Sequence, residues 1–231
     1  MKYSSVVPAI FVDRPNRFIA RVQVNGNVET VHVKNTGRCR ELLIPGRTVY
    51  LSVSDGAKRK TKFDLIAAEK IGQDGVPFLI NMDSQLPNAV VAEWLPNSGL
   101  FSKEAVIRRE VFFGSSRFDF FVQDGSRKAF LEVKGVTLEE NGIALFPDAP
   151  TERGVRHVNE LCACLEQGFE AYVLFVIQMK GIKEFRPNDQ MHQAFGDALR
   201  KARQNGVRIL VLDSIVKPDS VVIDTEIPIR L

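Results

Sequence analysis

Short runs of β-branched and aromatic residues, separated by turn residues, fill the first third of the chain. The runs lie at residues 18–24, 28–34, 48–54, 63–71 and 76–81. Asn25-Gly26 and Asp74-Gly75 are dipeptides typical of hairpin turns. Five short strands in about 65 residues predict a small closed barrel, of which the five-stranded oligonucleotide-binding (OB) barrel is one form.

From residue 85 onward, helical patterns alternate with apolar runs. Residues 85–99 and 189–204 read as helices, and 152–167 is an amphipathic helix with Thr151 or Asp148 as its N-cap. Residues 170–177, 207–212 and 221–231 read as strands, the first nearly continuous in apolar residues, as in a sheet covered on both faces. We therefore expect two domains, an OB-like barrel over 1–84 and an α/β domain with a mixed sheet over 85–231.

One segment of the second domain combines a hairpin pattern with charged residues. Residues 118–134 form two strand-like runs around Asp124-Gly125, and we read the segment that follows, up to Pro150, as a loop. Side chains two apart on a strand share a face, so Glu132 and Lys134 are expected side by side. The same rule places Phe118 and Phe120 on one face and Asp119 on the other. A hairpin of this kind gathers Asp119, Glu132 and Lys134 into one polar pocket.

That trio suits metal chemistry. Asp119 and Glu132 are candidate ligands of Mg²⁺ (or Mn²⁺), because Mg²⁺ is usually held by one or two carboxylates, waters and substrate phosphates. Lys134 is the candidate that orients or deprotonates the attacking water. A further acid, Glu93 on the first helix or Glu104 beyond it, is a candidate third ligand and catalytic residue. The ordinary alternative is an exposed strand edge with a surface acid before it.

Composition and charge narrow the classes of protein. The 231 residues are 45% hydrophobic and 26% charged, which is typical of a globular protein. There is no apolar run of membrane-spanning length and no signal-peptide pattern at the start, so we expect a cytoplasmic protein. The three cysteines lack zinc-ligand spacing. Residues 1–80 hold 13 Lys and Arg against 7 Asp and Glu, whereas the remainder holds 18 against 21. A basic first third indicates a polyanionic partner, DNA or RNA.

The basic residues of the barrel gather in two places. The candidate nucleic-acid-binding residues are Lys34, Asn35, Arg38 and Arg40, then Lys58, Arg59, Lys60 and Lys62. Binding through phosphates needs only such cations along a groove. A solvated loop is the alternative for the second group. Arg153 and His157 are four residues apart and therefore lie on one side of the helix 152–167, near its N-terminus. They are candidate phosphate contacts. Most lone helical histidines are instead structural.

Several motifs in order give the chain a family resemblance. They are HVKNTGR at 32–38 with ELL at 41–43 and PG at 45–46, FLEVKGVTL at 130–138, FPDAPTERG at 146–154, and His157 with Glu160. The hairpin with Asp119 and Glu-x-Lys resembles a PD-(D/E)xK nuclease core, and the whole chain resembles the sugar fermentation stimulation protein A family. That resemblance implies an OB-type barrel, a restriction-endonuclease-like domain, DNA binding without strong sequence preference, and regulation of sugar (maltose) metabolism.

Three functions follow as hypotheses. The first is a metal-dependent nuclease that grips the nucleic-acid backbone with its barrel. The second is a non-enzymatic DNA-binding regulator whose nuclease-derived core no longer cuts. The third, a small-molecule sensor, has little support because the chain has no glycine-rich nucleotide loop.

Overall fold

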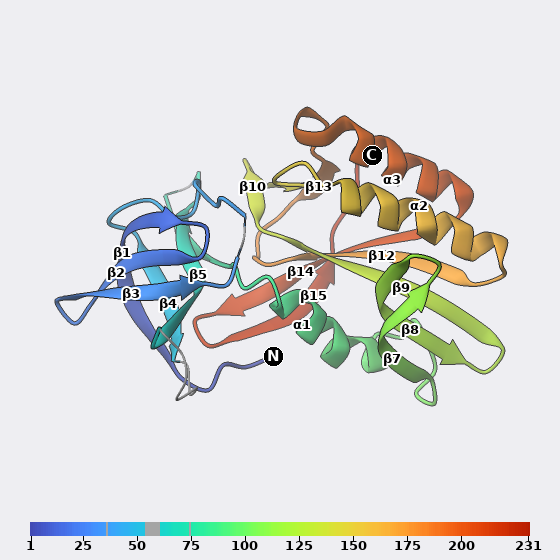
Figure 1. Cartoon of the computed structure of the whole chain (residues 1–231), viewed down its shortest axis with the longest axis horizontal. Helices are drawn as coiled ribbons and strands as arrows, with labels where there is room; N and C mark the ends of the chain where they lie inside the picture. The colour runs from blue at the N-terminus through green and yellow to red at the C-terminus, as the bar shows by residue number, and fades with distance from the viewer. Residues whose placement is uncertain (36, 54–60, 74) are drawn as a thin grey trace.

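The computed structural model describes residues 1–35, 37–53, 61–73 and 75–231. The barrel and the α/β domain lie side by side, with the barrel at the left of Figure 1 and two helices above the sheet of the other domain. Within the described residues, no helix is long and apolar enough to cross a membrane.

The barrel consists of β1 to β5, with β6 attached to β5. Their bounds are Val6–Asn16, Ile19–Val24, Asn27–Val33, Thr48–Val53, Phe63–Ile71 and Pro77–Asn81. The order is β3-β2-β1-β4-β5-β6, and parallel pairing of β3 with β5 closes the barrel. Val22, Val31, Leu51 and Leu65 are fully buried inside. The expected OB-type barrel is confirmed.

Strand β1 was not among the expected strands. Pro8 and Pro15 interrupt its apolar pattern, yet Pro8 pairs in register with Tyr50 of β4. Register shifts on either side of Asp13 bend β1 so that it pairs with both β2 and β4. Residues 76–81, expected as the fifth barrel strand, instead form β6 at the end of the sheet.

The α/β domain contains a six-stranded mixed sheet in the order β15-β14-β12-β9-β8-β7. The bounds from β7 to β9 are Val106–Phe113, Ser116–Asp124 and Arg127–Val136, and β12, β14 and β15 are Glu170–Ile177, Arg208–Lys217 and Ser220–Glu226. Strands β9, β12 and β14 are parallel, while β7, β8 and β15 pair antiparallel. The expected mixed sheet is confirmed.

Helices cover both faces of this sheet. Helices α2 (Glu152–Glu166) and α3 (Asp189–Asn205) lie on one face, and α1 (Leu86–Trp94), followed by the 3₁₀ turn η1 (Leu95–Asn97), lies on the other (Figure 1). Thr151 caps α2 by accepting a hydrogen bond from Gly154 N. Gly206 ends α3 with φ of 102°, a left-handed conformation that glycine adopts at little cost.

The segment expected as a loop contains a second hairpin. Strands β10 (Leu138–Glu140) and β11 (Ile143–Phe146) pair around Asn141-Gly142, and β13 (Glu184–Pro187) adds in parallel to β11. The expectation of a loop was wrong because Asn-Gly between two short apolar runs is itself a hairpin signal. This small sheet lies between the barrel and α3 (Figure 1).

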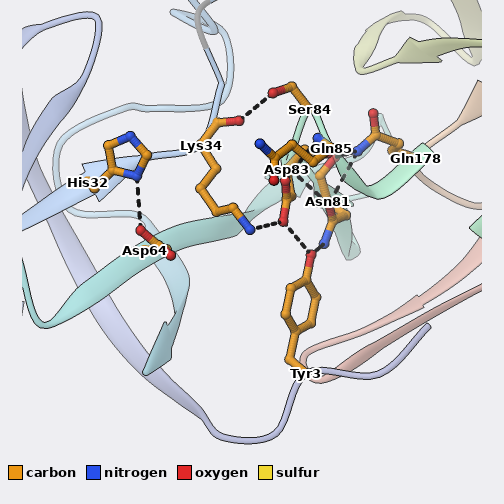
Figure 2. Close-up of polar contacts among 9 residues, drawn as sticks. All are labelled: Tyr3, His32, Lys34, Asp64, Asn81, Asp83, Ser84, Gln85 and Gln178. Atoms are coloured by element: carbon orange, nitrogen blue, oxygen red, sulfur yellow. Dashed lines mark hydrogen bonds and ion pairs between the residues drawn. The ribbon is translucent and has the colours of Figure 1, made fainter. Parts of the chain in front are cut away.

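The chain crosses between the two domains twice. Its first residues pack on the α/β domain. Lys2 forms an isolated antiparallel β-bridge with Ser220, and Tyr3 belongs to the apolar cluster beneath α1. The second crossing follows β6, where Asp83 is 1% exposed. Asp83 Oδ2 accepts hydrogen bonds from Lys34 Nζ at 2.7 Å and Tyr3 Oη at 3.2 Å (Figure 2). Both crossings therefore meet at one buried carboxylate.

Thiol reactivity is a test of this packing. Burial raises the pKa of Cys39 and of Cys164 to about 12, whereas Cys162 is only half-buried. Since the thiolate is the reactive species, we expect one thiol to react readily with an aromatic disulfide reagent at about pH 8, and all three in denaturant. Absorbance of the released thiolate measures both values. Three fast thiols in the native protein would contradict the buried positions.

Candidate metal and nucleic-acid site

The expected trio lies where β8 and β9 separate. Regular pairing of the two strands stops at Phe120 and Leu131. Asp119 Oδ2 then accepts from the backbone N of Val133 at 2.7 Å, and Oδ1 accepts from Asn88 Nδ2 at 2.7 Å. Asp119 is thus held from β9 and from the start of α1. Asn88 was not among the candidate site residues, and its contact depends on how α1 packs.

The face pattern of β8 differs from simple alternation at this point. Phe118 packs against Phe130 and His157 on the α2 side, whereas Phe120 packs on the α1 side. The expectation that Phe118 and Phe120 share a face was wrong. The neighbouring strand β7 is irregular at the same level, where Glu110 has φ of 57° and is missing from the pairing register.

Glu132 is 3% exposed and is held through one oxygen only. Its Oε1 lies 2.5 Å from Lys134 Nζ and 2.6 Å from His157 Nδ1, so the expected pairing of Glu132 with Lys134 on one face is present. Its Oε2 is buried and has no hydrogen-bond partner among the described residues. A buried carboxylate oxygen without a partner is costly, which points to a missing ligand.

Burial and mutual repulsion set the charges of the two acids. Burial, and then the charge of Glu132, raise the pKa of Asp119 above its usual 3.8. Burial also acts to raise the pKa of Glu132, but the hydrogen bond from His157 and the charge and hydrogen bond of Lys134 outweigh it and leave that pKa below its usual 4.5. In the pair, the negative charge of Asp119 is therefore less well stabilised than that of Glu132.

His157 supports Glu132 and does not face solvent. It is 2% exposed; its Nδ1 donates to Glu132, and its Nε2 accepts from Arg153 Nε at 3.3 Å. This arrangement fits the neutral tautomer protonated at Nδ1. The expectation that His157 contacts phosphate is corrected, because the histidine lies on the core side of α2. Arg153 is exposed at the beginning of the helix.

The two other candidate acids lie apart from this pair. The carboxylate of Glu93 is 62% exposed and binds the amino group of Met1. Glu93 is five residues beyond Asn88, a rotation of about 140° around α1. Glu104 is exposed before β7. The structure thus gives no support to Glu93 or Glu104 as a third ligand, and no cluster of three His, Cys, Asp or Glu side chains suited to a metal occurs in the described part of the chain.

The residues present nevertheless fit a hard divalent cation. A protein usually supplies only one or two carboxylates to Mg²⁺, and waters and phosphate oxygens are the other ligands. Asp119 and Glu132, whose Oε2 lacks a partner among the described residues, match this ligand set. His157 fixes Glu132 from behind, as a partner of a metal ligand does.

The expected nucleic-acid-binding residues of the barrel divide into four groups. Lys34 is committed to Asp83, and Asn35 accepts from Gly37 N at 2.7 Å. Arg38 and Arg40 are exposed, and with Arg186 they line a hollow of about 680 Å³ between the barrel loop and the start of α3. Lys62 is exposed with its ammonium 5.2 Å from the ring of Phe63. Lys58, Arg59 and Lys60 lie outside the described residues.

Arg14 shapes the barrel loop that carries these arginines. Its guanidinium donates to four backbone carbonyls, those of Arg17, Asn35, Gly37 and Arg38, each at 2.7 Å. Only a planar group with several donors satisfies such a ring of acceptors. Gly37 allows the loop to approach the α/β domain, because a Cβ there would lie 2.5 Å from Asp148 Oδ2.

Fold and site together define a two-domain protein, in which an OB barrel with an arginine-bearing loop adjoins a mixed-sheet domain with one buried acid, Glu132, and one half-buried acid, Asp119. The chain belongs to the sugar fermentation stimulation protein family. Family models match at residues 12–74, described as the "SfsA N-terminal OB domain", and at residues 85–220, the "Sugar fermentation stimulation protein RE domain".

Relatives and a solved structure match over the whole chain. A sugar fermentation stimulation protein homolog of Ruminiclostridium cellulolyticum is 52% identical over 231 residues, all of both chains. One of Desulfitobacterium hafniense strain Y51 is 57% identical over 221 residues, 96% of this chain and 94% of the relative. The structure of Pyrococcus furiosus SfsA in complex with Ca²⁺ has 28% identity and a TM-score of 0.85, and the match covers 100% of this chain and 98% of that one.

Proposed function

We propose that the protein is a divalent-metal-dependent nuclease that binds DNA through its phosphate backbone. One observation carries the proposal. Glu132 is buried with one oxygen saturated by Lys134 and His157 and the other without a partner, beside Asp119. A purely structural acid at this position would be expected to have both oxygens satisfied.

Each side chain has a distinct part in such a reaction. Asp119 and Glu132 would hold Mg²⁺ or Mn²⁺, which supplies charge neutralisation at the phosphate and a more acidic water. Lys134, anchored on Glu132, orients that water and offsets charge on the phosphate oxygens. Asn88 and the backbone N of Val133 keep the Asp119 carboxylate in place, and His157 does the same for Glu132.

The Pyrococcus furiosus relative supports a cation site, because its structure is described as a complex with Ca²⁺. Calcium, like magnesium, takes oxygen ligands, so carboxylates are suitable partners for both. DNA binding draws its support from the exposed Arg38 and Arg40 of the barrel loop, which can contact phosphate without reading sequence. The hollow that they line also contains Arg186, paired with Glu184, and the acids Glu41, Glu140, Asp148 and Asp189, so only the loop arginines are offered to the backbone.

A second function is a non-enzymatic DNA-binding regulator, here of sugar (maltose) metabolism as the family resemblance implies. It is favoured by one observation: within the ranges that the structure describes, only Asp119 and Glu132 meet at the site, while Glu93 binds Met1. Both functions predict salt-dependent DNA binding, so hydrolysis and metal uptake distinguish them.

The proposal is tested with purified protein and labelled single-stranded, duplex and branched DNA and RNA in Mg²⁺, Mn²⁺ or chelator. We expect metal-dependent cleavage of at least one substrate. Intact substrates in every metal condition, with binding retained, would exclude the nuclease and leave the regulator.

The arginine hollow has its own prediction. The double variant Arg38→Ala/Arg40→Ala is expected to lower DNA affinity and to reduce the slope of log K against log salt by about 2, because two phosphate contacts are lost. Fluorescence anisotropy at several salt concentrations measures the slope. Lys201→Ala/Lys217→Ala removes the same charge from exposed positions outside the hollow and serves as the control. Equal slopes for both double variants would place the DNA elsewhere.

A further inference from the structure

A cavity of about 320 Å³ lies between the barrel loop and the α/β domain, next to the acid pair. Its floor includes Gly135 and Val136, which directly follow Lys134 on β9. At about 3.3 Å per residue, Val136 lies about 13 Å beyond Glu132 along the strand. The cavity also shares Leu138, Leu145 and Asp148 with the arginine hollow. It therefore adjoins both the site of proposed chemistry and the proposed path of the backbone.

Gln178 presents a fixed hydrogen-bond acceptor to this cavity. The residue is 2% exposed, and its Nε2 donates to Asn81 O at 3.0 Å, Asn81 Oδ1 at 3.2 Å and Asp83 O at 3.2 Å. Those three acceptors fix the amide orientation, so Oε1 points away from them (Figure 2). No donor in the described part of the chain reaches Oε1.

Gly135 keeps that oxygen open. A Cβ at Gly135 would lie 2.6 Å from Gln178 Oε1, so any larger residue would crowd the acceptor. Across the cavity, Asn35 uses its Oδ1 on Gly37 N, which leaves its Nδ2 as a donor. One fixed acceptor and one amide donor thus line the same space.

The lining selects an uncharged ligand. Among the described lining residues only Asp148 is ionisable, so the cavity offers no cation for a phosphate. Phe146 and Pro147 add an apolar wall, and the volume is at the lower end of the ~300–1,000 Å³ of small-ligand sites. A flat group with donors and acceptors on its edge fits these walls. A nucleobase has this chemistry, whereas a base pair inside a duplex cannot enter.

We propose that the cavity binds one unpaired nucleobase of a strand whose backbone lies at the Asp119–Glu132 pair, with Gln178 accepting from the base. This inference rests on the proposed nucleic-acid binding and adds the substrate class. Taking a base out of its stack costs least where it is already unpaired. The protein therefore prefers overhangs, flaps or single strands to blunt duplex.

The test uses 2-aminopurine placed in turn at each unpaired position of a DNA with an overhang, in the presence of chelator. Emission is expected to rise on binding at one position only, and not at any position of a blunt duplex. Because no cleavage is needed, this result stands even if the nuclease proposal fails. Equal emission changes at all positions would overturn the inference.

A cavity-filling variant gives a second readout. Ala149 lines the cavity and is exposed, so Ala149→Phe is expected to fold, to abolish the position-specific emission and to weaken overhang binding about 10-fold, leaving duplex binding unchanged. Ala194→Phe, at an exposed position of α3, should match the unmodified protein. A folded Ala149→Phe variant that still prefers the overhang would refute the assignment. If free 2-aminopurine nucleoside monophosphate bound as tightly as the DNA with the overhang, the cavity would be a site for free nucleotides. That result would overturn the proposal that it binds a base within a nucleic-acid strand.

Discussion

The variant Asp119→Asn is expected to lose Mn²⁺ uptake and to slow metal-dependent DNA cleavage by about 1,000-fold. A metal that stabilises the transition state by several kcal/mol accounts for that loss. Its DNA affinity should stay the same or rise, because a negative charge near the phosphates is removed. Electron paramagnetic resonance of free Mn²⁺, a nicking assay and anisotropy measure the three quantities.

Thermal unfolding separates this effect from misfolding. Burial and Glu132 raise the pKa of Asp119, so its charged form is disfavoured in the folded protein. Its contribution therefore favours folding at low pH and diminishes as pH rises through its folded-state pKa. At neutral pH without metal, Asp119→Asn is expected to be similar in stability to the unmodified protein, because removal of the disfavoured charge offsets the loss of one acceptor for Val133 N or Asn88 Nδ2. Asp197→Asn, on the exposed side of α3, is the matched control and should cut normally. Full Mn²⁺ uptake by Asp119→Asn would refute the site.

The second large effect is expected at Asp83. Asp83→Ala should lower the free energy of unfolding by about 3 kcal/mol, since removing one partner of a buried pair leaves the other uncompensated. Lys34 would lose its carboxylate and Tyr3 an acceptor, and Gln85 N would lose its bond to Asp83 Oδ1. Urea unfolding followed by circular dichroism measures the change.

Asp13→Ala is the comparison for this variant. Asp13 pairs with Arg21 at the surface, where such pairs contribute little, so its unfolding midpoint should hardly move. Similar midpoints for the two variants would show that the Asp83 contacts contribute no more than a surface pair.

Local patterns predicted much of the fold and of the acid site. The spacing of two between Glu132 and Lys134 places them together on any strand, and the Thr151 cap depends only on its own turn. Strand β1 escaped prediction because its two partners come from different parts of the chain and its prolines mask the pattern. The β10–β11 hairpin had a local signal in Asn141-Gly142 that was read as a loop.

The supporting contacts required the folded chain. Asn88 reaches Asp119 only because α1 packs against β9 on the sheet face opposite α2. The sequence does not show whether His157 faces solvent or Glu132. Its direction depends on how α2 packs on the sheet. Gln178 bonds to residues more than 90 positions earlier, a distance at which spacing rules carry no information.

The double crossing between the domains restricts the orientation of the barrel relative to the α/β domain. A domain joined by a single flexible linker samples many orientations, and its effective concentration at a neighbouring site falls with linker length. Here the barrel is attached at both of its ends, near Tyr3 and Asp83. If the barrel binds DNA as proposed, the nucleic-acid strand would therefore meet the α/β domain in nearly one orientation, because folding has already fixed the position of the barrel.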